Sequence, residues 1–106
     1  MEPPPPEPAL VDELSGNRME VGDSFTIGRS PGADLVIDSE RISRKHALIR
    51  REGDGFLFYD LKSANGSWVD DRQVDQPVPL HEGSRIRIDS HRFTFIAGAG
   101  GDSSSL

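Results

Sequence analysis

The chain has 106 residues, a net charge of −6 and no cysteine, and 34% of its residues are hydrophobic. This length allows one domain with a single core, and the absence of cysteine excludes disulfides and thiolate metal sites. No apolar run is long enough to cross a bilayer, and the acidic, proline-rich N-terminus lacks the cationic and apolar regions of a secretory signal. We therefore expect a cytoplasmic protein without membrane insertion.

Charge is unevenly distributed along the chain. The first 23 residues carry six acidic side chains against one arginine, whereas residues 24–106 are nearly neutral. A local basic patch on an acidic chain suits a small anionic ligand, whereas bulk nucleic acid requires a broad positive surface. We therefore expect no nucleic-acid partner. The basic residues that gather in one short span are Arg29, Arg41, Arg44, Lys45, Arg50 and Arg51.

The two ends of the chain differ in composition from the part between them. Residues 1–8 include four consecutive prolines, which favour polyproline II and exclude a helix or an inner strand, so we expect a proline-rich, disordered lead. Residues 98–106 are mostly Gly and Ser, and we expect this tail to be flexible. Residues 9–97 are expected to form the folded domain.

Between these ends, short apolar runs with a period of two alternate with turn residues, which is typical of β-strands joined by tight turns. The strongest hairpin signal lies around Gly53-Asp54-Gly55, and no helical period is present. Pro77, Pro79 and Gly83 predict a loop. The pattern predicts an all-β sandwich of about ten strands, at residues 9–14, 18–21, 24–28, 35–37, 46–51, 56–61, 67–69, 72–74, 85–88 and 92–96.

Polar residues that suit a phosphate follow two of the expected strands. Arg29, after strand 24–28, can donate a forked pair of hydrogen bonds to two phosphate oxygens. Ser43 can donate both its hydroxyl and its backbone N–H, and Arg44 or Lys45 can add positive charge. Each residue alone also fits a solvated loop or a rim charge, so the prediction depends on their combination.

Other residues near these groups suit the shaping of loops. Gly28 allows other backbone to approach closely. His46 opens an apolar strand, where a histidine is more often a structural hydrogen-bonding group than a ligand or a base. Asn65-Gly66 is a turn dipeptide, and the Asn65 amide also offers a donor and an acceptor to an extended peptide backbone.

The order and spacing of these motifs resemble the forkhead-associated (FHA) family. The lines FTIGRS, ISRKHALI and SANGSWVDD carry the resemblance, which covers roughly residues 19–96. The resemblance implies a β-sandwich of about eleven short strands with the binding loops at one end. It also implies that the ligand is a phosphothreonine in an extended segment of another protein.

The resemblance implies a role for each matching position. Arg29 and Ser43 fall on the family's phosphate-contacting positions, and Arg44 falls on a neighbouring position that often assists. Asn65 falls on the asparagine that fixes the peptide backbone. The positions that shape and brace the loops are matched by Gly28, His46 and Gly66.

One position departs from the family pattern. Many members carry Thr or Ser directly before Asn-Gly, where this chain has Ala64. Ser63 is one residue earlier and cannot be assumed to substitute, so Ser63, Ala64 and Lys45 are secondary candidates. Losing one neutral hydrogen bond costs about 0.5–1.5 kcal/mol, which predicts modest affinity.

The preferred interpretation is a signalling adaptor that binds phosphothreonine in a substrate of a Ser/Thr kinase, without a cofactor or a metal. One alternative is a phosphate-independent interaction sandwich with a weakened phosphate site, which Ala64 supports. The sequence assigns no oligomeric state.

Two other classes of function fit the sequence less well. An oligonucleotide-binding barrel would stack bases on exposed aromatic residues, but the candidates lie in alternating runs that predict core positions. An enzyme is not expected, because His46, His81 and His91 have no partner pattern for nucleophilic or metal catalysis. The aromatic candidates are Phe56, Phe58, Tyr59 and Trp68.

Overall fold

The computed structural model describes residues 8–97 and contains eleven β-strands in two sheets. No helix occurs in this part of the chain, so it holds no helix that could span a membrane. Apart from Pro8, the proline-rich lead and the Gly/Ser-rich tail lie outside the described residues. The strands are β1 (Ala9–Asp12), β2 (Arg18–Glu20), β3 (Ser24–Gly28), β4 (Leu35–Val36), β5 (Ala47–Glu52), β6 (Gly55–Asp60), β7 (Trp68–Val69), β8 (Arg72–Gln73), β9 (Val78–Leu80), β10 (Arg85–Ile88) and β11 (His91–Ile96).

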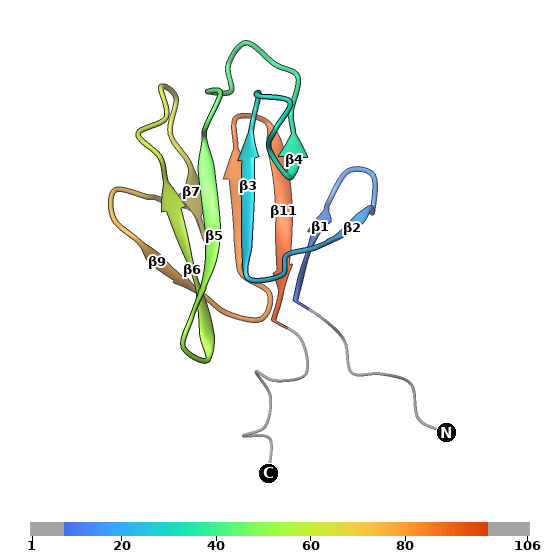
Figure 1. The fold of residues 1–106 in the computed structure, drawn as a ribbon, viewed down its shortest axis with the longest axis vertical. Helices are drawn as coiled ribbons and strands as arrows, with labels where there is room; N and C mark the ends of the chain where they lie inside the picture. The colour runs from blue at the N-terminus through green and yellow to red at the C-terminus, as the bar shows by residue number, and fades with distance from the viewer. Residues whose placement is uncertain (1–7, 98–106) are drawn as a thin grey trace.

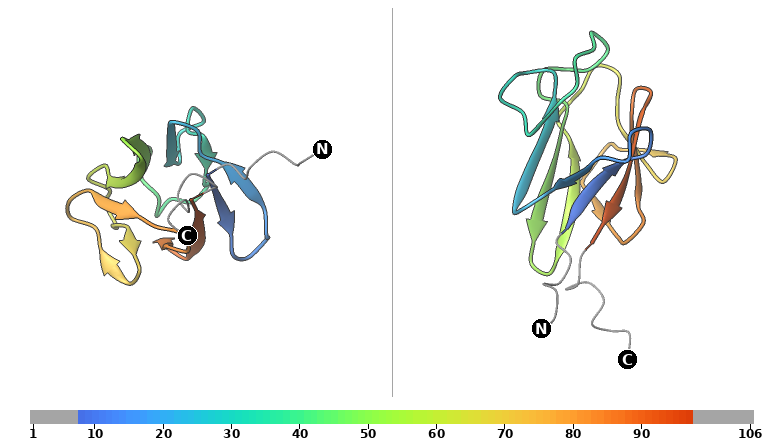
Figure 2. Two further views of the ribbon diagram at one scale, coloured as in Figure 1. Left: turned by 90° about the horizontal axis from the view of Figure 1, so that it is seen from below. Right: turned by 90° about the vertical axis from the view of Figure 1, so that its right-hand side faces the viewer.

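The two sheets face each other as a sandwich, which confirms the expected all-β class (Figures 1 and 2). One sheet has six strands in the order β2-β1-β11-β10-β7-β8, and the other has five in the order β4-β3-β5-β6-β9. The β3–β4 pair is parallel, and the other strand pairs are antiparallel. The predicted hairpin around Gly53 is the β5–β6 pair, closed by Glu52 opposite Gly55.

Strand β9 corrects the sequence prediction, which placed a loop around Pro77, Pro79 and Gly83. Val78–Leu80 pairs with β6, and Pro79 lies opposite Leu57. Because β9 is the last strand of its sheet, the missing N–H of Pro79 costs no hydrogen bond to a further strand. Leu80 points into the core with 6% of its surface exposed.

The first strand also ends earlier than predicted. β1 stops at Asp12 instead of residue 14, because the Asp12 carboxylate accepts the Leu14 N–H at 2.8 Å and turns the chain. Leu14 is consequently exposed. The other expected strands agree with the structure to within one residue at each end.

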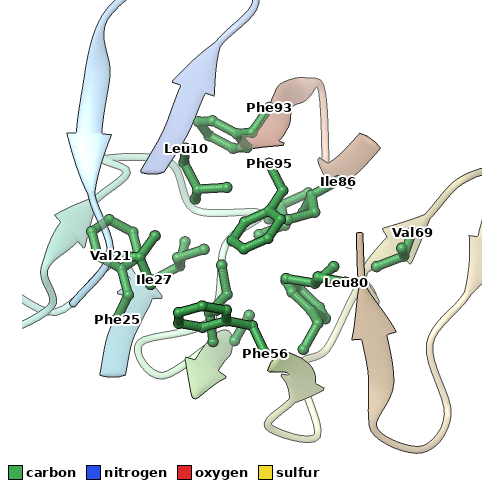
Figure 3. Packing of buried hydrophobic residues seen from close by; sticks show 14 of the residues in the cluster. Leu10, Val21, Phe25, Ile27, Phe56, Val69, Leu80, Ile86, Phe93 and Phe95 are labelled. Atoms are coloured by element: carbon green, nitrogen blue, oxygen red, sulfur yellow. The ribbon is translucent and has the colours of Figure 1, made fainter. Parts of the chain in front are cut away.

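The core lies between the sheets and is built from the inward-facing positions of both (Figure 3). Phe56 on β6 and Phe95 on β11 meet across the interface with ring centroids 5.4 Å apart. Tilted aromatic pairs of this kind add to the stabilisation from burial alone. Alternation of apolar and polar residues therefore sets which face of each strand is buried.

Three of the four aromatic residues considered for base stacking are buried or covered by another side chain. Phe56 and Phe58 are buried at 6% and 0% exposure. Tyr59 donates its hydroxyl to Glu52, and the Arg87 guanidinium covers the half-buried Trp68 ring at 4.2 Å. Among residues 8–97, the oligonucleotide-binding alternative therefore lacks the series of open aromatic rings that base stacking requires.

Three long loops and one tight turn gather at one end of the sandwich, at the top of Figure 1. They are the β3–β4 loop (29–34), the β4–β5 loop (37–46), the β6–β7 loop (61–67) and the β10–β11 turn (89–90). The predicted site residues belong to these segments or to the end of β3. The fold thus brings together segments that lie far apart in the sequence.

Candidate functional site

The end of β3 lies directly against the backbone of the β4–β5 loop. Arg29 N–H donates to the Ser43 carbonyl at 3.0 Å, and Ser30 N–H donates to the Arg44 carbonyl at 3.2 Å. A Cβ on Gly28 would lie 2.0 Å from the Arg44 carbonyl oxygen, so only glycine allows this approach. Gly28 therefore fixes the distance between the strand end and the loop that carries Ser43.

The Arg29 side chain is exposed and is held at one point. Its Nε donates to the Ile42 carbonyl at 3.2 Å. Among residues 8–97, neither terminal nitrogen of the guanidinium has a protein partner. The terminal nitrogens therefore remain available to donate side by side to two oxygens of an anion.

His46 is fully buried and joins three segments of the chain. Its backbone N–H donates to Ile27, its Nδ1 accepts the Ser43 N–H at 3.1 Å, and its Nε2 lies 2.9 Å from the Gly66 carbonyl. Because Nδ1 accepts and a carbonyl can only accept, Nε2 must carry the ring proton. The neutral imidazole thus ties β3, the β4–β5 loop and the β6–β7 loop together.

Ser43 presents its hydroxyl but not its N–H. The N–H is already donated to His46, which corrects the expectation that both groups could reach one phosphate. The hydroxyl oxygen accepts the Ala64 N–H at 2.9 Å, and this bond leaves the hydroxyl proton to donate elsewhere. Ser43 therefore offers one oriented donor beside Arg29.

The Asn65 amide is exposed but partly engaged. Its Nδ2 donates to the Arg41 carbonyl at 2.7 Å. This bond leaves Oδ1 as an acceptor and one Nδ2 hydrogen as a donor. This acceptor and this donor can pair with the N–H and the C=O of an extended peptide backbone.

The β6–β7 loop is braced from within by Asp60. Its carboxylate accepts the Ser63 and Ser67 hydroxyls, each at 2.6 Å, and the Ser63 N–H at 3.0 Å. Burial acts to raise the pKa of Asp60, but these hydrogen bonds outweigh it and hold the pKa below its ordinary value. Sequence reasoning missed Asp60, although the spacing Asp-x-x-Ser at a strand end could have indicated it.

The secondary candidates lie in different environments. The Ser63 hydroxyl donates to Asp60 and accepts the Gly66 N–H at 3.0 Å, so it faces its own loop and does not replace the hydroxyl missing at Ala64. Arg44 and Lys45 are exposed, and among the described residues neither side chain has a hydrogen-bond or ion-pair partner. They can contribute positive charge at the rim of the site.

Gly66 has a backbone that other residues rarely adopt. Its φ is +88°, and a Cβ there would lie 2.7 Å from Gln73 Nε2 and 3.2 Å from the Trp68 ring.

Residues 8–97 contain no cluster of His, Cys, Asp and Glu that could hold a metal ion. The chemistry offered by these loops is therefore hydrogen-bond donation, positive charge and the Asn65 Oδ1 acceptor.

Comparison with known proteins assigns the family. The FHA domain model matches residues 25–89. Since this match covers more than half of the chain, the protein belongs to the FHA family, as the sequence motifs indicated.

Particular relatives share much of the chain. The transcriptional regulatory protein EmbR of Mycobacterium tuberculosis is 42% identical over 92 residues, covering 86% of this chain and 24% of EmbR. The glycogen accumulation regulator GarA of Mycolicibacterium smegmatis is 38% identical over 77 residues, covering 73% of this chain and 48% of GarA. The chain thus spans about a quarter to a half of these curated relatives.

A solved structure gives the same fold. Mycobacterium tuberculosis EmbR in complex with a low affinity phosphopeptide matches with a TM-score of 0.81 and 36% identity. The match covers 87% of this chain and 24% of the EmbR chain.

Gly28→Ala should destabilise the fold by about 1–3 kcal/mol, because its Cβ would force the Arg44 carbonyl away. Gly32→Ala is the matched control, since nothing lies within 4 Å of its Cβ position. The control should change the free energy of unfolding by less than about 0.5 kcal/mol. Urea unfolding of both variants measures the difference, and equal stability would contradict the proposed close approach.

The lowered pKa of Asp60 predicts a pH dependence of stability. Its hydrogen bonds contribute fully above the ordinary carboxyl pKa of about 4 and are lost as pH falls through the lower folded-state value. The free energy of unfolding should therefore fall more steeply in acid for the wild type than for Asp60→Asn. Urea unfolding between about pH 5 and pH 2.5 compares the two slopes, and parallel slopes would refute the role of an ionised Asp60.

Proposed function

We propose that this chain binds a phosphothreonine in an extended segment of a partner protein. The observation that carries the proposal is the placement of Arg29, Ser43 and Asn65 on adjoining loops. Arg29 is bonded to the Ser43 carbonyl through its N–H, and the Ser43 hydroxyl is bonded to the residue before Asn65. Two guanidinium nitrogens without a partner among residues 8–97, one hydroxyl donor and one amide thus lie on adjoining loops, where one ligand can bind them together.

The phosphate is held by charge and by fixed donors. A phosphothreonine carries close to two negative charges at pH 7, with a second pKa near 6. The Arg29 terminal nitrogens donate to two of its oxygens, and the Ser43 hydroxyl donates to an oxygen as well. Arg44 and Lys45 add long-range attraction, which weakens with salt and below about pH 6.

Asn65 binds the peptide backbone, whereas Arg29 and Ser43 bind the phosphate. Its Oδ1 accepts a peptide N–H, and its second Nδ2 hydrogen donates to a peptide carbonyl. Preference for threonine over serine comes from burial of the γ-methyl, about 0.8 kcal/mol, and from the restricted χ1 of a β-branched residue.

The wider role follows from this binding activity. Residues 9–97 form the binding unit, and the chain acts as a signalling adaptor in the cytoplasm rather than as an enzyme. Its partner is a protein phosphorylated on threonine by a Ser/Thr kinase. EmbR and GarA, by their names regulators, support a regulatory context for a domain of this kind.

A phosphate-independent interaction sandwich is the second candidate. Two observations favour it: Ala64 carries no hydroxyl, and the Ser63 hydroxyl is engaged within its own loop. The dependence of binding on the phosphate separates the two candidates.

Arg29→Ala should abolish most phosphate-dependent binding, because two charge-assisted hydrogen bonds are lost. The expected cost is about 2–4 kcal/mol, roughly thirtyfold or more in affinity. Titration with a degenerate phosphothreonine library and its unphosphorylated counterpart measures the effect. Arg50→Ala, which removes an exposed arginine from the outer face of β5, is the control and should bind as the wild type does. Equal binding of both libraries would favour the phosphate-independent candidate.

Ala64→Ser should tighten phosphopeptide binding, because it adds a hydroxyl next to the Ser43 donor at an exposed position. One added hydrogen bond gives about 0.5–1.5 kcal/mol, roughly twofold to tenfold. The gain should disappear in the Arg29→Ala background if both residues act on the same phosphate. Unchanged affinity in Ala64→Ser would place residue 64 away from the phosphate.

A further inference from the structure

Asp89 occupies a backbone position that favours glycine. It is the first residue of the two-residue turn between β10 and β11, which Ile88 and His91 close. Its φ is +55°, in the left-handed region that costs most side chains conformational energy. Aspartate enters this region more readily than most side chains, because its short polar side chain can hydrogen-bond locally.

The Asp89 carboxylate is bonded to a residue 48 positions away in the sequence. Its Oδ1 accepts Arg41 Nε at 2.6 Å. The Asp89 side chain is 16% exposed, whereas that of Arg41 is 69% exposed. The hydrogen bond from Arg41 is the main cause that lowers the pKa of Asp89.

Arg41 is also hydrogen-bonded to Asn65, the asparagine of the site. The Arg41 carbonyl accepts Asn65 Nδ2 at 2.7 Å. The backbone carbonyl of Asp89 also accepts a hydrogen bond, from Arg87 Nη1 at 3.3 Å. The Arg87 guanidinium lies over the Trp68 ring. The turn is thus anchored to the sheet and connected to Asn65 through one residue.

We propose that Asp89 is a positioning residue for peptide binding: it fixes Arg41, whose carbonyl orients the Asn65 amide toward the ligand. This inference rests on the proposed function of the site. An ion pair with an exposed partner contributes little to the free energy of unfolding. We therefore expect loss of the Asp89 carboxylate to change the orientation of Asn65 more than the stability of the fold. Affinity and stability should therefore respond differently when Asp89 is replaced.

Asp89→Gly tests this separation, because glycine suits the turn but removes the carboxylate. Affinity for a phosphothreonine peptide chosen from the library should fall about threefold to tenfold, while the urea midpoint stays the same or rises. Asp89→Asn keeps an acceptor oxygen for Arg41 and should recover part of the loss. The control is Asp23→Ala, which removes the Arg51–Asp23 ion pair (3.4 Å) at the opposite end of the sandwich and should leave affinity unchanged (Figure 1).

A second readout examines Asn65 without any ligand. In the free protein, the Asn65 side-chain amide resonances should move toward solvent-exposed values in Asp89→Gly and stay unchanged in Asp23→Ala. Unchanged Asn65 resonances in Asp89→Gly would overturn the positioning role, whether or not a phosphopeptide binds. Altered resonances with unaltered affinity would overturn the link to binding, and a wild type that binds no phosphopeptide would overturn the proposed function alone.

Discussion

The hydrogen bonds of His46 determine the shape of the end of the sandwich that carries the site. Both ring nitrogens are used, one to accept the Ser43 N–H and one to donate to the Gly66 carbonyl. Because the ring is fully buried, losing either bond would leave a buried polar group without a partner, which is costly. The β4–β5 and β6–β7 loops therefore take one relative position, and the groups they carry are fixed before a ligand arrives.

Once the loops have satisfied their own polar groups, few groups remain for a ligand. Ser43 keeps its hydroxyl proton, Arg29 keeps its terminal nitrogens, and Asn65 keeps its Oδ1 and one N–H. The Ser43 N–H and the Ser63 hydroxyl are not available to a ligand, because they donate to His46 and Asp60. Fixed donors lower the entropic cost of binding, because little must be ordered when a ligand enters. The groups left for a ligand are thus few and are held in place by hydrogen bonds within the loops.

Much of the fold could be predicted from the sequence, because alternation of apolar and polar residues defines strands locally. The close approach at Gly28 was also predictable, since it needs a residue without a side chain. Strand β9 was missed because a proline is compatible with a strand only at a sheet edge, and the sequence does not show which strands are edges. The link from Asp89 through Arg41 to Asn65 joins distant segments and depends on how the two sheets pack.

The most direct test is to map the binding surface by NMR, titrating the labelled chain with a phosphothreonine peptide and with its unphosphorylated form. We predict that backbone shifts concentrate in residues 28–30, 41–46 and 63–66 and require the phosphate. Shifts on the outer faces of the sheets, or equal shifts with both peptides, would contradict it.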